Sequence, residues 1–420
     1  MTTHSPAPGT SAALDRAAAL DAADELGHLR GRFADPGDVV AYFDGNSLGR
    51  PLTASRERLA RFVDEQWGTR LIRSWDERWM DAPTELGDTL GRVALGAAPG
   101  QTVVADSTTV LLYKLARAAV GGRPGRNEIV LDSENFPTDR FVLEGVAEEC
   151  GLRLRWIRPD AEAGVTAEQV AECVGPDTAL VVLSHVAFRS GHLADMRAIT
   201  TLAHEAGALV LWDLCHSAGV VPVELDARGV DLAVGCTYKY LNGGPGSPAF
   251  AYVASALQDS LRQPIQGWMG DGAPFAMAGA YRPAEGIRRF ISGTPPILGM
   301  VPMRDMLELI DEAGLDAVRG KSVALTEYLI ELAEELLVPL GVRIATPRAA
   351  ERRGGHVTLD HPEFKAVTAD LWTRGVIPDF RPPSGMRIGL SPLSTGFTEV
   401  AHGLTQVRAT LLRRTEGAGA

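Results

Sequence analysis

The chain has 420 residues, of which 45% are hydrophobic and 22% are charged, and its formal net charge is −12. This length and composition are typical of a globular protein with two domains. The negative charge argues against nucleic acid or an anionic membrane as the main partner, because polyanions attract surfaces rich in Lys and Arg. An anion that binds this protein must therefore be held by a local site.

The N-terminal segment and the cysteines bear on the location of the protein. Residues 1–12 are rich in Ser, Thr, Pro and Gly, which predicts disorder. The first 30 residues lack the basic region and the apolar core of a secretory signal. No apolar run approaches the ~20 residues that are needed to span a bilayer. The four cysteines show no metal-ligand spacing, and a chain of this length does not need disulfides. We therefore expect a cytoplasmic protein with reduced thiols and no bound metal.

The middle of the chain has the pattern of an α/β fold. An Ala-rich acidic helix is predicted near residues 13–32, and a short strand with a polar turn at 39–52. Short apolar runs then alternate with helical stretches, at residues 102–105, 128–131, 152–157, 179–184, 208–213, 230–236 and 248–253. Several runs are almost continuously apolar, as strands are in a parallel sheet that helices cover on both faces. We expect functional groups where these strands end.

The rest of the chain predicts a second, smaller domain. Residues 264–296 are rich in Gly, Pro and aromatic residues, which indicates an ordered loop region between domains. Helical periodicity returns at 300–338, and a last α+β segment ends with residues 385–397. We place a large, mainly parallel-sheet domain at residues 71–297. A smaller α+β domain would span residues 298–420, with a contribution from the N-terminal segment, residues 1–70.

Polar side chains stand at the ends of three predicted strands: Ser184, Asp213 and Lys239. A lone carboxylate inside a doubly covered sheet would be costly, whereas at a strand end it can face a ligand. His216 follows Asp213 by three residues; alone, that pair fits a helix cap equally well, and no third residue has the spacing of a metal ligand. Alone, Lys239 could be a surface lysine, but the Gly- and Pro-rich loop after it allows close approach to the backbone.

One cofactor would use all of these groups. The amine of Lys239 can form a Schiff base with an aldehyde, and burial beside a cationic group would lower its pKa. A carboxylate such as Asp213 keeps a pyridine nitrogen protonated, so that the ring accepts electrons. Phe136 would supply an aromatic ring to stack on the cofactor, with Asp139 three residues later, although a phenylalanine alone is more often a core residue.

A phosphate site is predicted at the beginning of a helix. Ser107, Thr108 and Thr109 follow a predicted strand and open a predicted helix, whose N-terminus can hold a phosphate group. Alone, this pattern would be a plain N-cap. Together with the lysine, the carboxylate and the ring, it predicts pyridoxal 5'-phosphate in an enzyme of fold type I.

The sequence resembles the kynureninase family. The segments that carry the resemblance are "YFDGNSLG", "LIRSW", "NFPTD", "WDLCHSAG", "CTYKYLNGGPG", "GWMG" and "TPPI", in the order of that family, between about residues 40 and 400. The resemblance implies a fold type I, pyridoxal-phosphate-dependent transferase fold and a homodimer. It also implies the hydrolytic β-cleavage of L-kynurenine, or 3-hydroxykynurenine, to L-alanine and anthranilate, or 3-hydroxyanthranilate, a step of tryptophan catabolism.

The resemblance also assigns roles to residues around the cofactor. Lys239 would form the Schiff base, Asp213 would pair with the pyridine nitrogen, and Phe136 would stack on the ring. Tyr238 would be the acid–base group for the proton transfers. The remaining cofactor contacts are assigned to His216, Asp139 and Ser184 around the ring, and to Thr108, Thr109 and Tyr238 at the phosphate.

Further roles follow for the substrate and for a second subunit. Arg387 matches the arginine that binds the substrate α-carboxylate, a task suited to a planar bidentate donor. Ser47 and Trp75 match positions on the substrate side. Trp268 and Thr294 match positions that complete the phosphate site across a dimer interface.

Some features leave other activities open. Leu111 and Ala187 stand where bacterial kynureninases usually carry Asn, and Ser394 stands where they usually carry Tyr. A related enzyme of specialised metabolism could therefore act on a substituted kynurenine, or cleave a C–C or C–S bond of another β-substituted amino acid. A cysteine desulfurase would need a cysteine after the Schiff-base lysine, and the last cysteine here is Cys236. An aminotransferase or a cofactor-binding sensor fits the motifs less well.

Overall fold

A seven-stranded sheet forms the centre of the larger unit in the computed structural model, which describes residues 10–277 and 279–417. The strand order is β2-β8-β7-β6-β5-β3-β4, and β8 runs antiparallel to both of its neighbours in a sheet whose other pairs are parallel. The strands are β2 (Thr102–Ala105), β3 (Glu128–Asp132), β4 (Arg153–Ile157), β5 (Thr178–Ser184), β6 (Leu209–Asp213), β7 (Leu232–Gly235) and β8 (Ala249–Val253). The seven strands predicted between residues 102 and 253 are confirmed.

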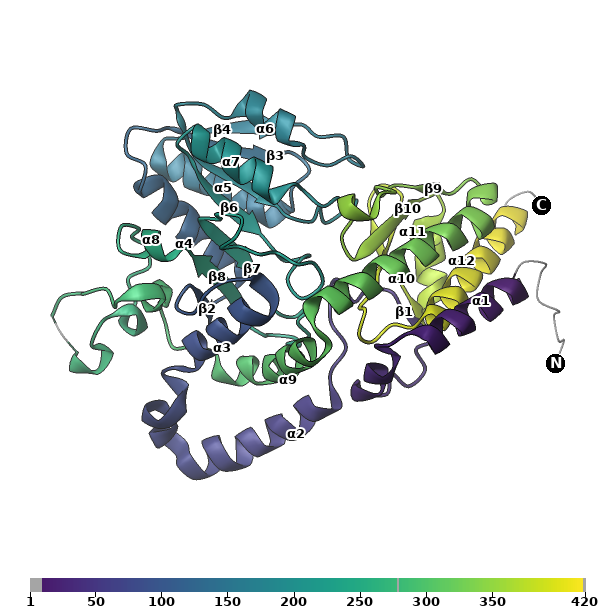
Figure 1. Cartoon of the computed structure of the whole chain (residues 1–420), viewed down its shortest axis with the longest axis horizontal. Helices are drawn as coiled ribbons and strands as arrows, with labels where there is room; N and C mark the ends of the chain where they lie inside the picture. Colours follow the sequence, from purple (N-terminus) through teal and green to yellow (C-terminus); the bar gives the residue numbers. More distant parts are fainter. Residues whose placement is uncertain (1–9, 278, 418–420) are drawn as a thin grey trace.

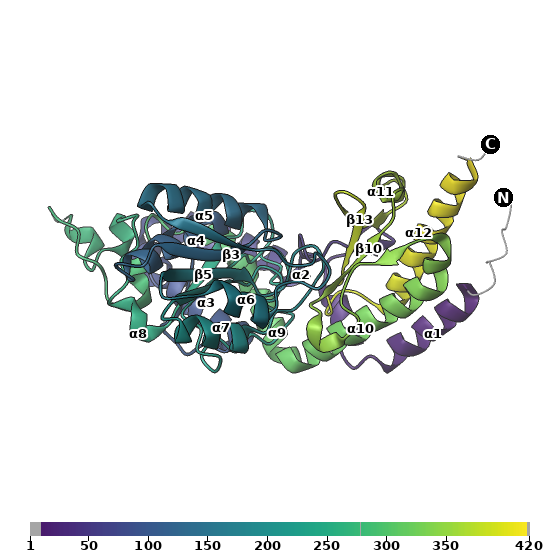
Figure 2. The ribbon, with the colours of Figure 1, turned by 90° about the horizontal axis from the view of Figure 1, so that it is seen from above.

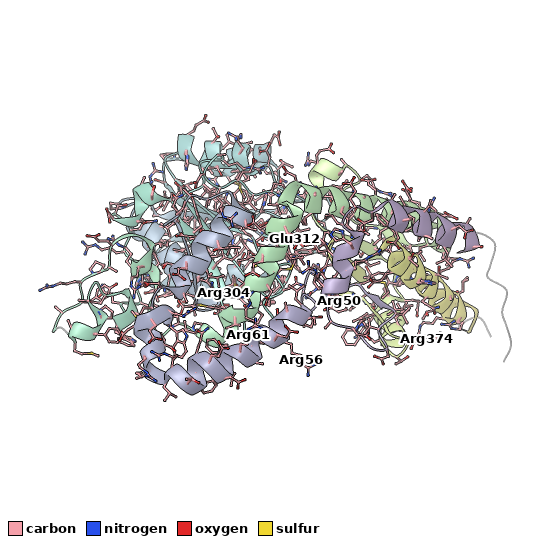
Figure 3. The ribbon with its side chains drawn as sticks, turned by 60° about the horizontal axis from the view of Figure 1, so that its bottom comes forward. Arg50, Arg56, Arg61, Arg304, Glu312 and Arg374 are labelled. Carbon is pink, nitrogen blue, oxygen red and sulfur yellow. The ribbon has the colours of Figure 1, made fainter. Side chains whose placement is uncertain are left out.

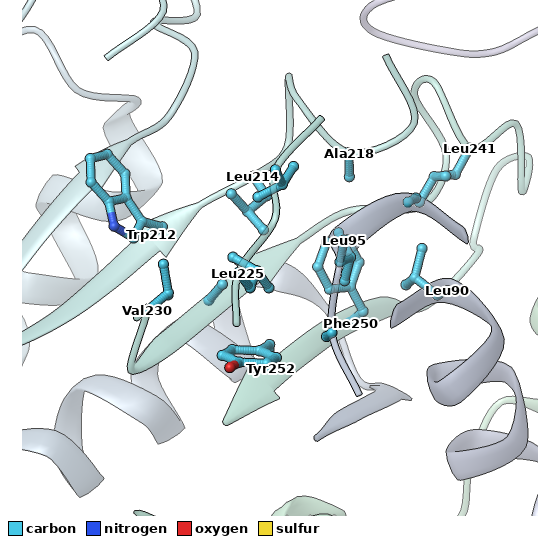
Figure 4. Packing of buried hydrophobic residues seen from close by; sticks show 14 of the residues in the cluster. Leu90, Leu95, Trp212, Leu214, Ala218, Leu225, Val230, Leu241, Phe250 and Tyr252 are labelled. Atoms are coloured by element: carbon cyan, nitrogen blue, oxygen red, sulfur yellow. The ribbon is translucent and has the colours of Figure 1, made fainter. Parts of the chain in front are cut away.

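Helices cover both faces of this sheet, as Figure 2 shows. Helices α4 (Thr108–Gly121) and α5 (Pro137–Cys150) lie on one side, and α3 (Ala82–Leu90), α6 (Ala167–Cys173) and α7 (Met196–Glu205) lie on the other. Successive residues of β6 therefore enter different apolar cores: Leu211 packs on the α4 side, and Trp212 packs on the opposite side with Phe250 and Tyr252 (Figure 4). Such burial of alternate residues on both faces explains the continuous apolar runs in the sequence.

The smaller unit contains a four-stranded antiparallel sheet in the order β12-β13-β10-β9. Its strands are β9 (Arg343–Ile344), β10 (His356–Asp360), β12 (Asp379–Arg381) and β13 (Gly385–Gly389), and its helices are α10 (Leu315–Leu336), α11 (Phe364–Trp372) and α12 (Phe397–Gly417). Figure 1 shows these elements on the right of the molecule, beside both described ends of the chain. The two units together form the predicted fold of type I.

The N-terminal segment packs into the smaller unit. Helix α1 (Thr10–Ala23) lies against α12, and the Tyr328 hydroxyl of α10 donates a hydrogen bond to the Ala13 carbonyl, at 2.9 Å. Strand β1 (Ala41–Tyr42) pairs in parallel with β11 (Val376–Ile377). The disorder predicted for residues 10–12 is wrong, because the helix begins at Thr10; residues 1–9 lie outside the described chain. The predicted helix is also divided, since a 3₁₀ helix, η1 (Gly27–Arg32), follows α1.

Helix α9 (Ile297–Ala313) connects the two units. Met303, Leu307 and Ile310 of α9 are part of the apolar core under the large sheet. Helix α2 (Thr53–Arg61) packs on the other side of α9, where Asp305 accepts hydrogen bonds from Ser55 and Arg58 at 2.9 and 2.8 Å. Figure 3 shows this face, with Arg56 and Arg61 on α2 and Arg304 and Glu312 on α9. The division of the chain at residues 70 and 297 stays a prediction.

Short helices and turns complete the chain. The segment predicted as an ordered loop contains the 3₁₀ turns η6 (Trp268–Gly270), η7 (Pro274–Ala276) and η8 (Gly286–Phe290). The other short helices are η2 (Phe62–Arg70), η3 (Leu71–Arg73), η4 (Trp75–Trp79), η5 (Gly91–Leu95), α8 (Ser255–Gln258), η9 (Val338–Leu340) and η10 (Ala350–Arg352). Among the described residues, no helix is both long and apolar enough to cross a membrane.

Candidate active site

The parallel strands bring the predicted polar residues to one edge of the large sheet. Ser184 of β5 lies directly opposite Asp213 of β6 in the ladder, and Asp213 lies opposite Val234 of β7. Lys239 follows β7 by four residues. Because the carboxyl ends of parallel strands meet at the same edge, residues distant in sequence share one site.

Lys239 lies between an imidazole and an aromatic ring. Its Nζ is 3.0 Å from Nε2 of His216 and 5.9 Å from the centre of the Phe136 ring. Burial, together with the charges of Lys239 and Arg387, lowers the pKa of His216 well below its usual value, so its imidazole is neutral near pH 7. A neutral imidazole can exchange a hydrogen bond with the lysine without adding charge to the site.

The pKa of the Lys239 amine is raised, whereas the sequence predicts that it is lowered. Burial of the amine lowers its pKa, but the neighbouring Cys236, Cys215 and Asp213 act in the opposite direction and outweigh burial, so that the pKa of the free amine is raised. The expected lowering by a nearby cation is therefore wrong for the unliganded protein. Arg387 does lower the pKa of Lys239, but it is a weaker influence than these neighbours.

Two carboxyl groups, those of Asp213 and Asp139, are buried next to each other in this site. Asp213 accepts a hydrogen bond from the Cys215 backbone N–H at 2.7 Å, and the Ser184 hydroxyl lies 3.5 Å from its other oxygen. Asp139 is buried in the first turn of α5, and burial, followed by the charge of Asp213, raises its pKa well above the ordinary value. Burial and the neighbouring carboxyl group therefore favour the neutral form of Asp139.

The structure adds Asn135 to this group. Its Oδ1 accepts hydrogen bonds from the Ser184 hydroxyl at 2.7 Å and from the Phe136 backbone N–H at 2.8 Å. The Asn135 side chain thus sets the position of both neighbours, while its Nδ2 is buried without a partner in the described chain. The sequence signal was available, because Asn135 follows β3 as the other polar residues follow their strands.

The N-terminus of α4 opens at the same sheet edge. Ser107 is the N-cap, and its hydroxyl accepts a hydrogen bond from the Val110 N–H at 3.4 Å. Thr108 and Thr109 form the beginning of the first turn, next to the helix N–H groups that lack partners within the helix. This arrangement can hold an anion, because the helix dipole and the free N–H groups both favour negative charge.

The small domain contributes a buried arginine. Arg387 of β13 is 1% exposed, and its guanidinium donates to the Phe188 carbonyl at 2.8 Å and to the Ser47 hydroxyl at 2.6 Å. Asp379 lies 2.8 Å and Asp44 3.7 Å from the same guanidinium. Sequence reasoning found Arg387 and Ser47 but missed both carboxylates, which offset the cost of burying the positive charge.

Contacts join Arg387 to the Lys239 side of the cleft. Phe188, whose carbonyl accepts from Arg387, packs edge-to-face on Phe136 with ring centres 5.4 Å apart. On the other side, the ring of His356 from β10 lies 5.5 Å from that of His216. Lys239 and Arg387 are therefore linked through these side chains where the two domains meet, and we call this region the cleft.

The segment "GNSLG" packs directly on the backbone of the lysine loop. The Gly49 N–H donates to the Tyr238 carbonyl at 2.8 Å, and a Cβ at Gly49 would lie 2.4 Å from the Lys239 carbonyl oxygen. Only glycine allows this approach. The contact fixes the loop that presents Ser47 to Arg387.

The other predicted residues lie at different distances from this cleft. Tyr238 is half-buried next to Lys239, and burial, followed by Cys236 and Cys215, raises its pKa, so the phenol is neutral and can donate a proton. Trp75 packs edge-to-face on Trp79 within η4, 5.3 Å between ring centres. Trp268 and Thr294 are exposed at the surface. The roles of these residues, like those of the cleft residues, stay predictions.

Two family models match the chain. Residues 318–407 match the kynureninase C-terminal domain, and residues 100–224 match the DegT/DnrJ/EryC1/StrS aminotransferase family. A kynureninase from Pseudomonas fluorescens is 43% identical over 389 residues, which cover 91% of each chain.

Solved structures are similar in fold. A C-DES mutant with glycine covalently linked to its PLP cofactor has a TM-score of 0.79 and 19% identity, covering 90% of this chain and 98% of its own. An apo cysteine desulfurase from Thermococcus onnurineus NA1 has a TM-score of 0.76 and 19% identity, covering 93% and 97%. At such identities the likeness establishes the fold alone.

Proposed function

The chain belongs to the kynureninase family, and from this membership we propose that it hydrolyses L-kynurenine or 3-hydroxykynurenine to L-alanine and the corresponding anthranilate. It is a pyridoxal-phosphate-dependent enzyme of fold type I. The observation that carries the substrate proposal is 43% identity across 91% of a kynureninase, and the burial of Arg387 at 1% exposure supports it.

The residues of the cleft fit the cofactor. An amine, an aromatic ring and a carboxylate face one another, and His216 Nδ1, Asn135 Nδ2 and Asp139 Oδ2 are buried there with no partner in the described chain. Buried polar atoms without partners are costly, so they favour a ligand that supplies hydrogen bonds. Pyridoxal phosphate, when bound, supplies an aldehyde for amines and a ring that accepts electrons. The phosphate would lie at the first turn of α4, beside Thr108 and Thr109.

Each wall of the cleft would have its own task. The amine of Lys239 would accept the α-proton of the substrate, while neutral His216 keeps that amine in place. The phenol of Tyr238 stays protonated and would donate a proton to the substrate Cβ, which receives the electron pair when the Cβ–Cγ bond breaks and becomes the methyl carbon of alanine. Arg387, whose buried Nε has no partner among the described residues, would bind the substrate carboxylate, with Ser47 fixing the orientation of the guanidinium.

The substrate proposal is tested by incubating the purified holoenzyme with L-kynurenine and with 3-hydroxykynurenine. Equal amounts of alanine and of the matching anthranilate, measured by chromatography, are expected from at least one of them. Turnover of neither would overturn the proposal. A C–S substrate such as cystine is the control, because the fold neighbours include enzymes that act on sulfur compounds.

We also propose a homodimer with active sites at the subunit interface. Large apolar side chains are exposed on two projecting segments: Trp67 and Ile72 at 54% and 76%, and Trp268 and Phe275 at 41% and 54%. Such patches favour a protein partner, and a second copy would also bring Trp268 and Thr294 to a neighbouring phosphate site. The mass of the purified protein in solution tests this proposal: a mass twice that of one chain is expected, and the mass of a single chain would contradict it.

A cytoplasmic location is the remaining proposal. All four cysteines are free, the sulfur of Cys236 lies 3.9 Å from the carbonyl oxygen of Cys215, and both cysteines raise the pKa of the neighbouring Lys239. Free thiols next to a functional lysine suit a reducing compartment. Fractionation of the producing cells, followed by detection of the chain in the cytoplasmic fraction, tests the location.

A further inference from the structure

A second buried lysine, Lys114, has no part in the mechanism proposed above. It lies on α4, its side chain is 0% exposed, and burial lowers its pKa. Its Nζ forms an ion pair with Asp106 at 2.9 Å and also donates to the carbonyl oxygen of Phe290. Burial of an ammonium group costs free energy of folding, so its placement between these two acceptors indicates a specific role.

The ion pair with Lys114 holds Asp106 at the turn between β2 and α4. Asp106 stands between the end of β2 and the N-cap Ser107, and its φ is +47°, a left-handed conformation that L residues rarely adopt. Its carbonyl also accepts a hydrogen bond from the Ala249 N–H of β8, at 3.1 Å. This single strained residue turns the chain from the strand into α4, and so decides where Thr108 and Thr109 point.

We propose that Lys114 is a positioning residue for the phosphate group of the cofactor. Its ion pair keeps Asp106 in the left-handed conformation and thereby fixes Ser107, Thr108 and Thr109 around the phosphate. The bond to Phe290 anchors the ammonium on the other side, at the end of η8. The inference rests on the proposed function, because it places the phosphate at the beginning of α4.

The phosphate-specific part of cofactor affinity tests this role. The apoenzyme and a Lys114→Met variant, which keeps the volume of the side chain but removes the charge, are titrated with pyridoxal 5'-phosphate and with pyridoxal, which lacks the phosphate. The Kd for pyridoxal phosphate should rise tenfold or more, while the Kd for pyridoxal should change less than twofold. A merely structural defect would weaken the binding of both ligands alike.

A matched control comes from the small domain. Lys321 of α10 is also buried, and its Nζ lies 2.7 Å from Asp24, which directly follows α1. Lys321→Met should leave both dissociation constants within twofold of wild type. An unchanged Kd for pyridoxal phosphate in Lys114→Met, or an equal loss of affinity for both ligands, would overturn the role given to Lys114 but not the proposed function. A wild-type protein that binds neither ligand would instead overturn the proposed function.

Asp106 provides a second test if Lys114→Met does not fold. Asn adopts left-handed conformations more readily than Ala does, so Asp106→Asn keeps the turn while Asp106→Ala disfavours it. The Kd for pyridoxal phosphate should therefore increase from wild type to Asp106→Asn and further to Asp106→Ala, with pyridoxal binding nearly constant. Equal affinities of wild type and Asp106→Ala would contradict the role given to the ion pair.

Discussion

Nζ of Lys239 lies 3.0 Å from Nε2 of His216, whose imidazole is buried and neutral. The side chain that is proposed to react is therefore held in place by an uncharged partner, His216, whereas Asp213 is the proposed partner of the pyridine nitrogen. Asp213 and His216, three positions apart, thus have separate proposed tasks, and Lys239 is the residue that is proposed to react with the cofactor.

Borohydride reduction of the holoenzyme should attach the cofactor permanently to Lys239. Peptide mapping by mass spectrometry locates the label, and the other lysines of the chain, Lys114, Lys321 and Lys365, serve as internal controls. Lys239→Ala should lose both the covalent label and the yellow colour of the bound cofactor. A label on any of the other lysines would show that the reactive residue has been misplaced.

Loss of the Arg387 guanidinium should damage catalysis without removing the cofactor. We expect Arg387→Ala to lower kcat/KM about a hundredfold or more, because a charged hydrogen bond in a desolvated cleft is lost. The absorbance of the bound cofactor should persist, since Arg387 contacts Ser47, Phe188 and two carboxylates rather than the cofactor residues.

Arg353 offers the matched control for that variant. It is also 1% exposed and pairs with Glu327 in the small domain. Arg353→Met measures what the loss of a buried arginine costs in general, and its kcat/KM should stay within a fewfold of wild type. The clamp would be misplaced if Arg387→Ala lost the cofactor outright or kept full kcat/KM.

Mixed dimers should reveal whether Trp268 serves the neighbouring subunit. Lys239→Ala chains and Trp268→Ala chains are each expected to form weakly active homodimers. A mixed dimer should regain about half of wild-type activity, because one of its two sites combines an intact Lys239 with an intact Trp268 from the other chain. Activity that does not rise on mixing, measured after subunit exchange, would place Trp268 in its own subunit's site or outside any site.

Buried histidines should make the fold sensitive to mild acid. Burial, and then the charges of Arg228 and Arg319, lower the pKa of His185 to about 3. Between that pH and the ordinary value near 6.5, the unfolded chain binds a proton that the folded chain does not. The contribution of His185 to the free energy of unfolding is therefore complete above pH 6.5. It decreases as the pH falls, by about 2 kcal/mol at pH 5.

The measurement is the decrease in Tm from pH 7.5 to pH 5.0. We expect a smaller decrease, by about 2 °C, in His185→Phe than in wild type, because phenylalanine fills the site beside Trp212 and takes up no proton. His402→Gln, at an exposed position of α12, should retain the wild-type decrease. An identical decrease in His185→Phe and wild type would refute this source of acid sensitivity.

Much of the cofactor side of the cleft was predictable from the sequence. The strands before Ser184 and Asp213 are continuous apolar runs, so the first polar residue after each run marks a strand end at the sheet edge. The cap at Ser107 is equally local, because a hydroxyl before a helical run bonds to the first turn. The strand ends and the helix cap depend on residues that are close in sequence, so the pattern of apolar and polar residues predicts them.

The opposite wall was decided by tertiary structure alone. Asp44 follows a two-residue strand, Asp379 begins a three-residue edge strand, and neither has a local pattern that points to Arg387. The pairing of His356 with His216 likewise joins residues 140 positions apart. Periodicity in a sequence tells which face of an element is buried, but not which distant element covers it. The partners of a buried charge are chosen by that long-range packing, because only there are they close enough to offset the cost of removing the charge from water.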